Sequence, residues 1–130
     1  MYKRQVYRLS ESTLGLLGFG RIGKRISEKA ISFGMNVIAY DPFLKQSDVS
    51  GVKLLDLNNV LAESDFISLH LPLNDQTNHI IDDKQLELMK QDSILINVSR
   101  GGLINENALI KYLTSGKLRG VGLDLSLIHI

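Results

Sequence analysis

Three glycines near the start of the chain follow a short apolar run, in the pattern Gly18-x-Gly20-x-x-Gly23. Residues 14–17 predict a buried strand, and the residues after Gly23 have helical spacing. In such a unit the first glycine allows a tight turn, the second lets backbone N–H groups approach a phosphate, and the third lets the helix pack closely on the sheet. The free N–H groups and the dipole at the helix start favour an anion. We therefore predict a turn that binds the pyrophosphate of a dinucleotide.

An acidic residue, Asp41, ends the next apolar run at residues 35–40, about 20 residues past the glycines. A carboxylate at this place can accept hydrogen bonds from an adenosine ribose and repels a 2′-phosphate. The spacing therefore predicts NAD rather than NADP. A structural glycine-rich turn with an unrelated surface aspartate is the alternative that this spacing leaves open.

The segment after the glycine turn has the periodicity of an amphipathic helix. Ile22, Ile26, Ala30 and Phe33 recur at helical spacing, and charged residues occupy the other positions. We expect these four side chains to face the sheet, and Gly34 to follow the end of the helix.

The remaining chain alternates apolar runs with helical patterns. Predicted strands lie at residues 35–40, 52–54, 65–69, 94–97 and 121–125, and predicted helices at 57–63, 83–89 and, capped by Asn105, up to residue 114. Near-continuous apolar strands that alternate with helices are typical of a parallel sheet covered on both faces. The predicted fold class is α/β, a doubly wound Rossmann sheet with helices on both faces.

Ligands bind such sheets at the carboxyl ends of the strands, which points to Asp41, residues 70–72 and 98–100, and Asp124. Arg100 is the candidate for chemistry there. A guanidinium can bind a carboxylate through two parallel hydrogen bonds and can polarise a carbonyl. An arginine that caps the strand end or pairs with a local acid is the alternative.

Composition excludes several classes of protein. The 130 residues carry a net charge of +1, which does not favour binding to nucleic acid or to an anionic membrane. Cysteine is absent, no apolar run reaches the roughly 20 residues of a membrane span, and no signal peptide is visible. Histidines and acids show no metal-ligand spacing. We expect a cytoplasmic protein of one domain without a metal.

Five motifs in order give the chain a resemblance to a known family over roughly residues 10–125. They are Gly-Phe-Gly-Arg-Ile-Gly at 18–23, Tyr-Asp-Pro at 40–42, Ser-Leu-His-Leu-Pro-Leu at 68–73 with Thr77 following, Asn-Val-Ser-Arg-Gly-Gly at 97–102, and Gly-Val-Gly-Leu-Asp at 120–124. The chain resembles the NAD-dependent D-isomer-specific 2-hydroxyacid dehydrogenases, which include phosphoglycerate dehydrogenase and glyoxylate/hydroxypyruvate reductases.

The resemblance implies a site along the carboxyl ends of the strands. Backbone N–H groups of Arg21 and Ile22 would contact the pyrophosphate, and Asp124 would bind the nicotinamide carboxamide. The implied cofactor-binding residues are Gly18, Gly20, Arg21, Ile22, Gly23, Asp41, Leu71, Pro72, Thr77, Val98, Ser99, Arg100 and Asp124. Arg100 is also the implied catalytic residue. The family's proton-donor His and its orienting Glu would lie beyond this chain, and we expect His70 and His79 to be structural or solvated.

The implied activity is hydride transfer between NAD and a small 2-hydroxy acid or its 2-oxo partner, in a homodimer. One alternative is an NAD-sensing module of the same fold that acts as a transcriptional co-repressor through dimerisation. Another adenosine ligand, S-adenosylmethionine, is disfavoured by the segment at 97–102.

The two ends of the chain depart from the family's pattern. Residues 1–5 can be encoded by a DNA sequence whose reverse complement encodes residues 125–129, as expected for an inserted element such as a library adapter. We expect a truncated reading of a longer gene, in which residues 1–5 and about 125–130 are foreign. The expected organisation is an N-terminal segment at 1–12, an NAD-binding domain at 13–124 and a tail at 125–130. Such a chain would bind NAD weakly and would not turn over substrate.

Overall fold

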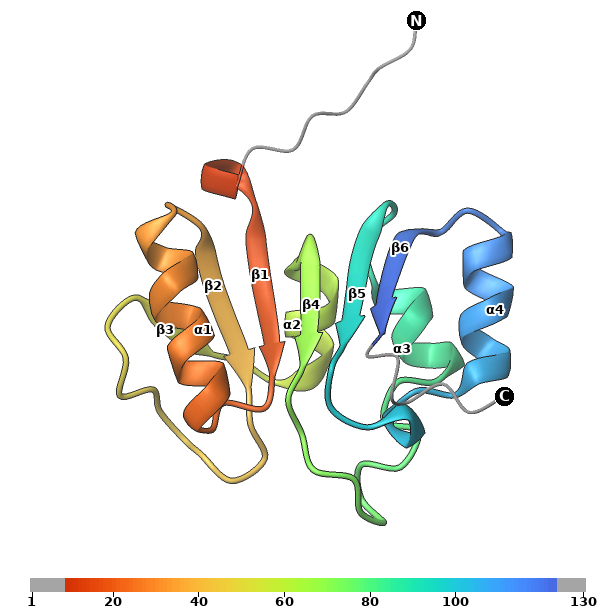
Figure 1. Cartoon of the computed structure of the whole chain (residues 1–130), viewed down its shortest axis with the longest axis horizontal. Helices are drawn as coiled ribbons and strands as arrows, with labels where there is room; N and C mark the ends of the chain where they lie inside the picture. The colour runs from red at the N-terminus through yellow and green to blue at the C-terminus, as the bar shows by residue number, and fades with distance from the viewer. Residues whose placement is uncertain (1–8, 124–130) are drawn as a thin grey trace, which may run out of the picture.

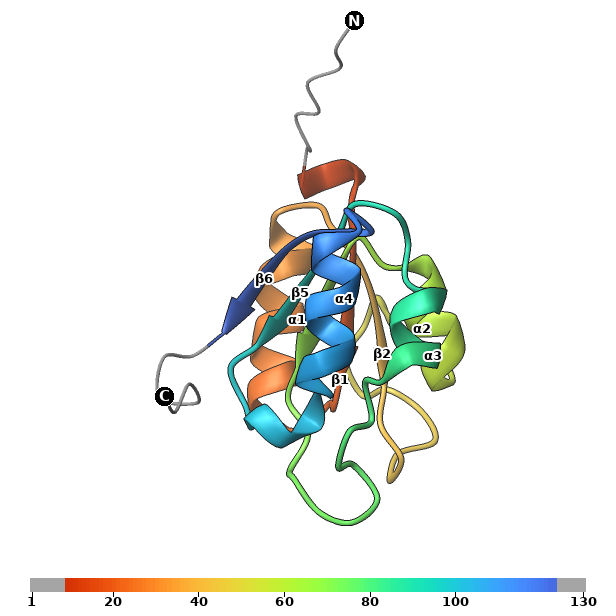
Figure 2. The same ribbon diagram turned by 90° about the vertical axis from the view of Figure 1, so that its right-hand side faces the viewer.

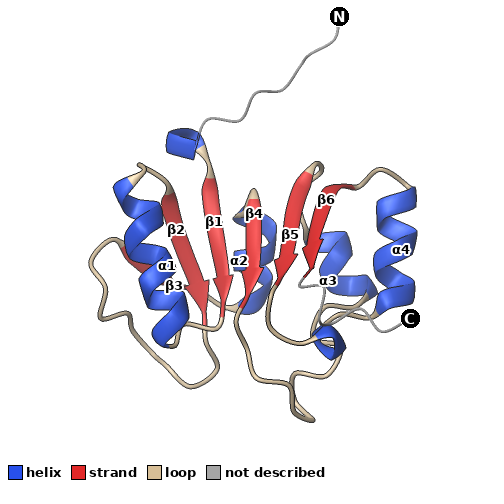
Figure 3. Cartoon of the chain, viewed as in Figure 1, coloured by secondary structure: helices blue, strands red, loops and turns tan. Residues whose placement is uncertain are grey.

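The computed structural model describes residues 9–123, which form a six-stranded sheet with the order β3-β2-β1-β4-β5-β6 (Figures 1 and 3). All neighbouring strands pair in parallel. The strands are β1 (Thr13–Leu17), β2 (Asn36–Tyr40), β3 (Val52–Leu54), β4 (Phe66–Leu69), β5 (Ser93–Asn97) and β6 (Leu118–Leu123). The helices are α1 (Arg21–Ser32), α2 (Leu57–Glu63), α3 (Asp83–Leu88) and α4 (Glu106–Thr114), with short 3-10 turns at Leu9–Glu11 and Gly101–Leu103.

Helices cover both faces of the sheet, with α1 on one side and α2 and α3 on the other (Figure 2). Alternate residues of the central strands pack into two separate hydrophobic cores, one on each face of the sheet. Leu14 and Leu16 of β1 pack with Ala30 of α1, whereas Leu17 packs in the cluster that contains residues of α2, α3 and α4. The predicted doubly wound α/β fold is confirmed. Because the strand order reverses at β1, the carboxyl ends of β1 and β4 open a crevice there.

The helix starts differ in one respect that matters for the site. Asp56, Asp82 and the predicted cap Asn105 each accept a hydrogen bond from a backbone N–H in the first turn of α2, α3 and α4. Helix α1 begins after Gly20, which offers no side-chain acceptor. The first N–H groups of α1 are therefore left for another partner.

Two expectations about packing are wrong. Ile22, in the first turn of α1, and Phe33, which directly follows α1, are 64% and 65% exposed. Ala30 is buried and Ile26 packs against the same core, as expected, and Gly23 and Ser27 are buried as well. Ile22 lies in the first turn of α1, beside the carboxyl edge of the sheet and not over its strands. Ser27 can be buried because its hydroxyl donates to the Lys24 carbonyl at 2.6 Å.

The last strand begins at Leu118, three residues before the predicted start, and its predicted end lies outside the described residues. Gly120 and Gly122 weaken the strand pattern there, because glycine is disfavoured in strands. Both residues lie on the α1 side of the sheet, opposite Val121, which packs with the α2–α4 core. Ile94 and Ile96 of β5 pair with these glycines and are only partly buried.

A glycine-to-alanine pair in the strands tests the packing of α2 on the sheet. A Cβ at Gly15 would collide with the Ser64 hydroxyl and lie 2.8 Å from Val60 Cγ1, whereas a Cβ at Gly120 would meet nothing within 4 Å. We expect Gly15→Ala to lower the free energy of unfolding by about 1–3 kcal/mol through overpacking. Gly120→Ala, the matched control, should leave it unchanged or raise it by up to about 1 kcal/mol. Urea denaturation measures both, and equal effects would contradict the packing described.

Candidate functional site

The glycine turn between β1 and α1 places its three glycines in three different environments. Gly18 has a φ of +103°, and a Cβ there would lie 2.5 Å from the His70 carbonyl oxygen. A Cβ at Gly23 would lie 2.7 Å from the Gly18 carbonyl oxygen. At Gly20, in contrast, a Cβ would meet nothing within 4 Å. The protein itself occupies the space beside the first and third glycines, and the second faces open space.

Asp41, at the carboxyl end of β2, faces the glycine turn. Its Oδ2 accepts a hydrogen bond from the Phe19 N–H at 2.8 Å, and its Oδ1 accepts one from the Phe43 N–H, also at 2.8 Å. The carboxylate is half-buried. The sequence spacing between Asp41 and the glycines therefore corresponds to a hydrogen bond from Phe19, which lies between Gly18 and Gly20, to the Asp41 carboxylate.

A hollow of about 520 Å³ extends from the glycine turn to the ends of β4 and β5. It brings together six of the predicted site residues and one histidine from the end of β4. Its lining residues are Gly20, Arg21, Ile22, Gly23, His70, Val98 and Ser99. Ile22 and Val98 are both exposed, so this hollow has apolar walls beside the free N–H groups of α1.

A smaller hollow of about 70 Å³ lies between the end of β2 and the loop after β4, where Leu71, Pro72 and Thr77 line it with Pro42 and Phe43. Thr77 is buried, and its hydroxyl donates to the Pro72 carbonyl at 2.6 Å and accepts from the Asn74 N–H at 2.9 Å. The Thr77 hydroxyl therefore holds the shape of this loop.

Arg100 lies outside both of these hollows. It lines a third hollow of about 490 Å³, which it shares with Leu73, His79 and the start of α4. Its side chain is exposed and has no hydrogen-bond or ion-pair partner among residues 9–123, so the alternative of a local acid partner finds no support there. Asp124 lies outside the described residues.

Asn97 is a further residue that shapes this region. It begins the motif at 97–102, but no role was predicted for it from the sequence. It is fully buried at the end of β5, where its Nδ2 donates to the Arg100 carbonyl at 2.8 Å and its Oδ1 accepts from the Ser99 N–H at 3.0 Å. Ser99 Oγ donates to the Leu71 carbonyl at 2.8 Å and so ties the loops after β4 and β5 together. An asparagine two residues before a serine at a strand end is the pattern of an Asx turn, and it could have indicated this role.

His70 is half-buried in the larger hollow, and its Nε2 lies 2.8 Å from the Ser68 hydroxyl. Burial lowers the pKa of the His70 imidazole below its ordinary value, because the charged form loses hydration. Burial therefore favours the neutral form of the His70 imidazole. The expectation that it is structural fits its bond to Ser68, although its ring also borders the hollow.

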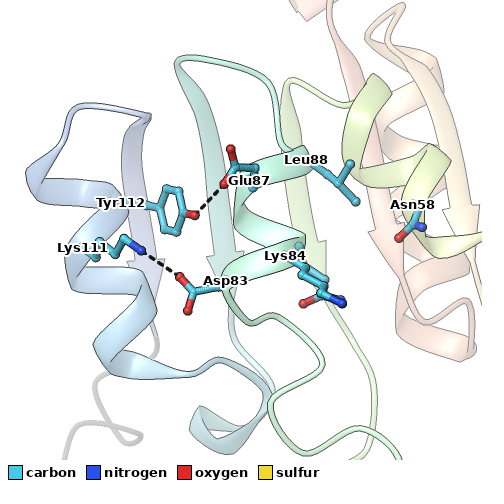
Figure 4. A pocket seen from close by; sticks show the side chains of 8 residues that line it. Asn58, Asp83, Lys84, Glu87, Leu88, Lys111 and Tyr112 are labelled. Carbon is cyan, nitrogen blue, oxygen red and sulfur yellow. Dashed lines mark hydrogen bonds and ion pairs between the residues drawn. The ribbon is translucent and has the colours of Figure 1, made fainter.

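A further hollow of about 510 Å³ lies between α3 and α4, away from the strand ends (Figure 4). Its polar groups satisfy one another: Lys111 Nζ lies 3.3 Å from Asp83 Oδ1, and the Tyr112 hydroxyl donates to Glu87 Oε1 at 3.1 Å. The polar groups of these four residues are therefore paired with one another and are not free to bind a ligand.

The sequence matches the family profile of the D-isomer specific 2-hydroxyacid dehydrogenase, NAD binding domain, over residues 1–126. The chain belongs to this family. Its cofactor is NAD, and the fold and the family inferred from the motifs are confirmed.

Similar proteins and structures agree with this assignment. The chain is 47% identical to the hydroxypyruvate reductase of Thermotoga maritima over 113 residues, which are 87% of this chain and 37% of that protein. It is 47% identical to the glyoxylate reductase of Thermococcus litoralis over 92% of this chain and 37% of that protein. The crystal structure of D-lactate dehydrogenase from Aquifex aeolicus, complexed with NAD and lactic acid, superimposes with a TM-score of 0.88 at 39% identity, over 92% of this chain and 36% of that chain.

The chain thus spans about a third of the length of the curated relatives it matches. Within residues 9–123, no three His, Asp or Glu side chains are grouped so that they could hold a metal ion. None of the helices in that range is both long and apolar enough to cross a membrane.

The burial of His70 predicts a dependence of stability on pH. The folded chain binds the His70 proton less readily than the unfolded chain, so the free energy of unfolding should fall as the pH drops below about 6.5. We expect His70→Gln to remove this part of the dependence, measured by urea denaturation between about pH 8 and about pH 5. Carboxyl groups contribute equally to both proteins and cancel in the difference.

The control for this experiment is His79→Asn, because His79 is exposed and asparagine tolerates its positive φ of 55°. This variant should keep the pH dependence of the unchanged chain. A His70→Gln variant with the same dependence as the unchanged chain would contradict a His70 imidazole whose pKa is lowered by burial.

Proposed function

We propose that this NAD-binding domain belongs to a protein that transfers hydride between NAD and a 2-hydroxy acid or its 2-oxo partner. The observation that carries the proposal is the difference among the three glycines: neighbouring backbone fills the space beside Gly18 and Gly23, and open space lies beside Gly20. A turn shaped only for folding would need the first and third glycines but not the second. The second glycine, next to uncapped N–H groups of α1, fits a phosphate ligand.

The adenosine half of the cofactor is proposed to lie along β2 and the loop after β4. Asp41 would accept hydrogen bonds from the ribose hydroxyls, since each of its oxygens has a further lone pair beyond its bond to a backbone N–H. The small hollow lined by Pro42, Leu71 and Pro72 offers apolar contact of the kind that suits an adenine ring. The Thr77 hydroxyl would act by holding this loop.

The pyrophosphate would lie over Gly20, within reach of the N–H groups of Arg21 and Ile22. The nicotinamide side would then border Ile22, Val98 and Ser99 in the larger hollow. Bound NAD supplies the hydride acceptor, and its reduced form the donor. The role of Asp124 at the carboxamide stays a prediction.

Arg100 is proposed as the residue that binds the substrate carboxylate and polarises the reacting carbonyl. Its exposed guanidinium has no partner among the described residues, and Asn97 fixes the backbone that carries it. We propose that proton transfer comes from a His and a Glu outside this chain, since Nε2 of the half-buried His70 lies at hydrogen-bond distance, 2.8 Å, from the Ser68 hydroxyl. The chain alone would then bind NAD without turnover. A homodimer and a cytoplasmic location remain predictions.

Calorimetry on this chain tests the cofactor site. We expect heat with NAD, and binding of NADP at least about tenfold weaker because Asp41 repels the 2′-phosphate. Gly20→Ala should weaken NAD binding about 10- to 100-fold, since its methyl group would project into the phosphate site. The same variant should unfold at the same urea concentration as the unchanged chain.

The control is Gly120→Ala, which also adds a methyl group to open space but lies on β6. It should bind NAD as the unchanged chain does. NAD binding that is indifferent to Gly20→Ala, or NADP binding as tight as NAD binding, would contradict the proposed site.

A longer protein that carries this domain tests the proposed reaction. Arg100→Ala should lower kcat/KM for a 2-oxo acid at least about 100-fold, because a charge-assisted contact to the substrate is lost, while NADH binding stays unchanged. Arg25→Ala, on the exposed side of α1, is the matched control and should retain full activity. Unchanged turnover in Arg100→Ala would remove its catalytic role.

A further inference from the structure

The carboxylate of Asp41 is held by two backbone N–H groups from different segments. One is that of Phe19, inside the glycine turn, and the other is that of Phe43, in the loop after β2. Both distances are 2.8 Å, which is in the range of the strong bonds that a charged acceptor forms. One side chain therefore joins the glycine turn to the loop that borders the small hollow.

The Phe19 N–H depends on this acceptor. Phe19 is 0% exposed, so its backbone is shielded from water along with its ring. The ring packs in the core beside α1, and the N–H has Asp41 Oδ2 as its hydrogen-bond partner. Without that oxygen, a buried donor would lose its bond, which is costly in a protein interior.

Phe19 lies directly before Gly20, so its anchoring decides how the phosphate-facing part of the turn is presented. The ring fixes one end of Phe19 in the core, and Asp41 fixes the amide. The preceding amide is held as well, because the Gly18 N–H donates to the Tyr40 carbonyl at 2.7 Å. The end of β2, at Tyr40 and Asp41, thus supports two consecutive amides of the glycine turn.

We propose that Asp41 is the positioning residue of the glycine turn, which it holds through the Phe19 amide, in addition to its proposed contact with the ribose. The ribose part rests on the proposed function, but the support of the turn requires no ligand. The same carboxylate then sets both the preference for NAD and the shape of the pyrophosphate site. Replacing Asp41 to admit a 2′-phosphate succeeds only with a residue that still accepts the Phe19 N–H.

Amide hydrogen exchange on the ligand-free chain tests the support of the turn. Exchange of Phe19 relative to Leu16, in the core of β1, should be about tenfold faster or more in Asp41→Ala than in the unchanged chain. Asp41→Asn keeps one oxygen acceptor and should retain slow exchange at Phe19. Asp75→Ala, which removes an exposed carboxylate from the loop after β4, is the control and should leave Phe19 unchanged.

The comparison with Leu16 separates a local change from global unfolding. If Asp41→Ala does not fold, the hydrogen bond can be tested by NMR on the unchanged chain. We expect a scalar coupling across this bond, from the Phe19 nitrogen to the Asp41 carboxyl carbon. Absence of this coupling, or Phe19 exchange in a folded Asp41→Ala within twofold of the unchanged chain, overturns the proposal. Neither result depends on NAD binding, so each is distinct from a failure of the proposed function.

Titration with NADP tests the consequence for cofactor preference. If Asp41 only repels the 2′-phosphate, Asp41→Ala and Asp41→Asn gain NADP affinity equally, since both remove the charge. If it also supports the turn, Asp41→Asn should bind NADP about tenfold more tightly than Asp41→Ala, or better. Equal gains in the two variants overturn the proposal.

Discussion

The carboxyl edge of this sheet depends on a close approach between two backbones, at Gly18 and His70. The approach needs both the positive φ of Gly18 and the absence of a side chain there, because a Cβ would lie 2.5 Å from the His70 carbonyl oxygen. It brings the glycine turn against the loop that follows β4. The larger hollow and the start of α1 take their positions from this contact, so the site is built around a backbone approach that only glycine permits.

Around that contact, short hydrogen bonds connect the loops at the strand ends to one another. Asp41 joins the loop after β2 to the glycine turn, and Ser99 joins the loop after β5 to the loop after β4. Asn97 and Thr77 hold two of these loops from inside. The groups that face the hollows are thereby oriented before any ligand arrives, which reduces the ordering that binding requires. Arg100 differs from these groups, because it is exposed and has no partner among residues 9–123.

Much of the fold could be predicted because local patterns and long-range packing agree. Strand β3 and helix α2 have the predicted bounds, and Asn105 caps α4 as its side chain indicated. The middle of the apolar face of α1 was predicted, since Ala30 is buried and Ile26 packs on the core. Its first turn was not, because periodicity does not tell which turn of a helix extends past the strands beneath it; Ile22 is apolar, but it borders the hollow. The start of β6 was missed because Gly120 interrupts the strand pattern there, and its place in the sheet depends on pairing with β5 and not on local propensity.

The same limit applies to the site. The glycine spacing and Asp41 could be recognised from sequence, and the structure brings them into contact. The direct bond between Asp41 and the Phe19 amide could not be foreseen, since it depends on how the ends of two adjacent strands meet. Arg100 was expected among the cofactor-binding residues with Val98 and Ser99, yet the loop after β5 places Val98 and Ser99 at one hollow and Arg100 at another. Loop direction of this kind is a tertiary property.

The unequal surroundings of the three glycines also separate two kinds of selection within one motif. Any descendant of this chain that must still fold is constrained at Gly18 and Gly23, whatever it does. In the proposed binding mode, Gly20 is under constraint only while a phosphate binds beside it. In a lineage that no longer bound the cofactor, we expect Gly20 to be substituted first, while Gly18 and Gly23 would be retained because the fold still requires them.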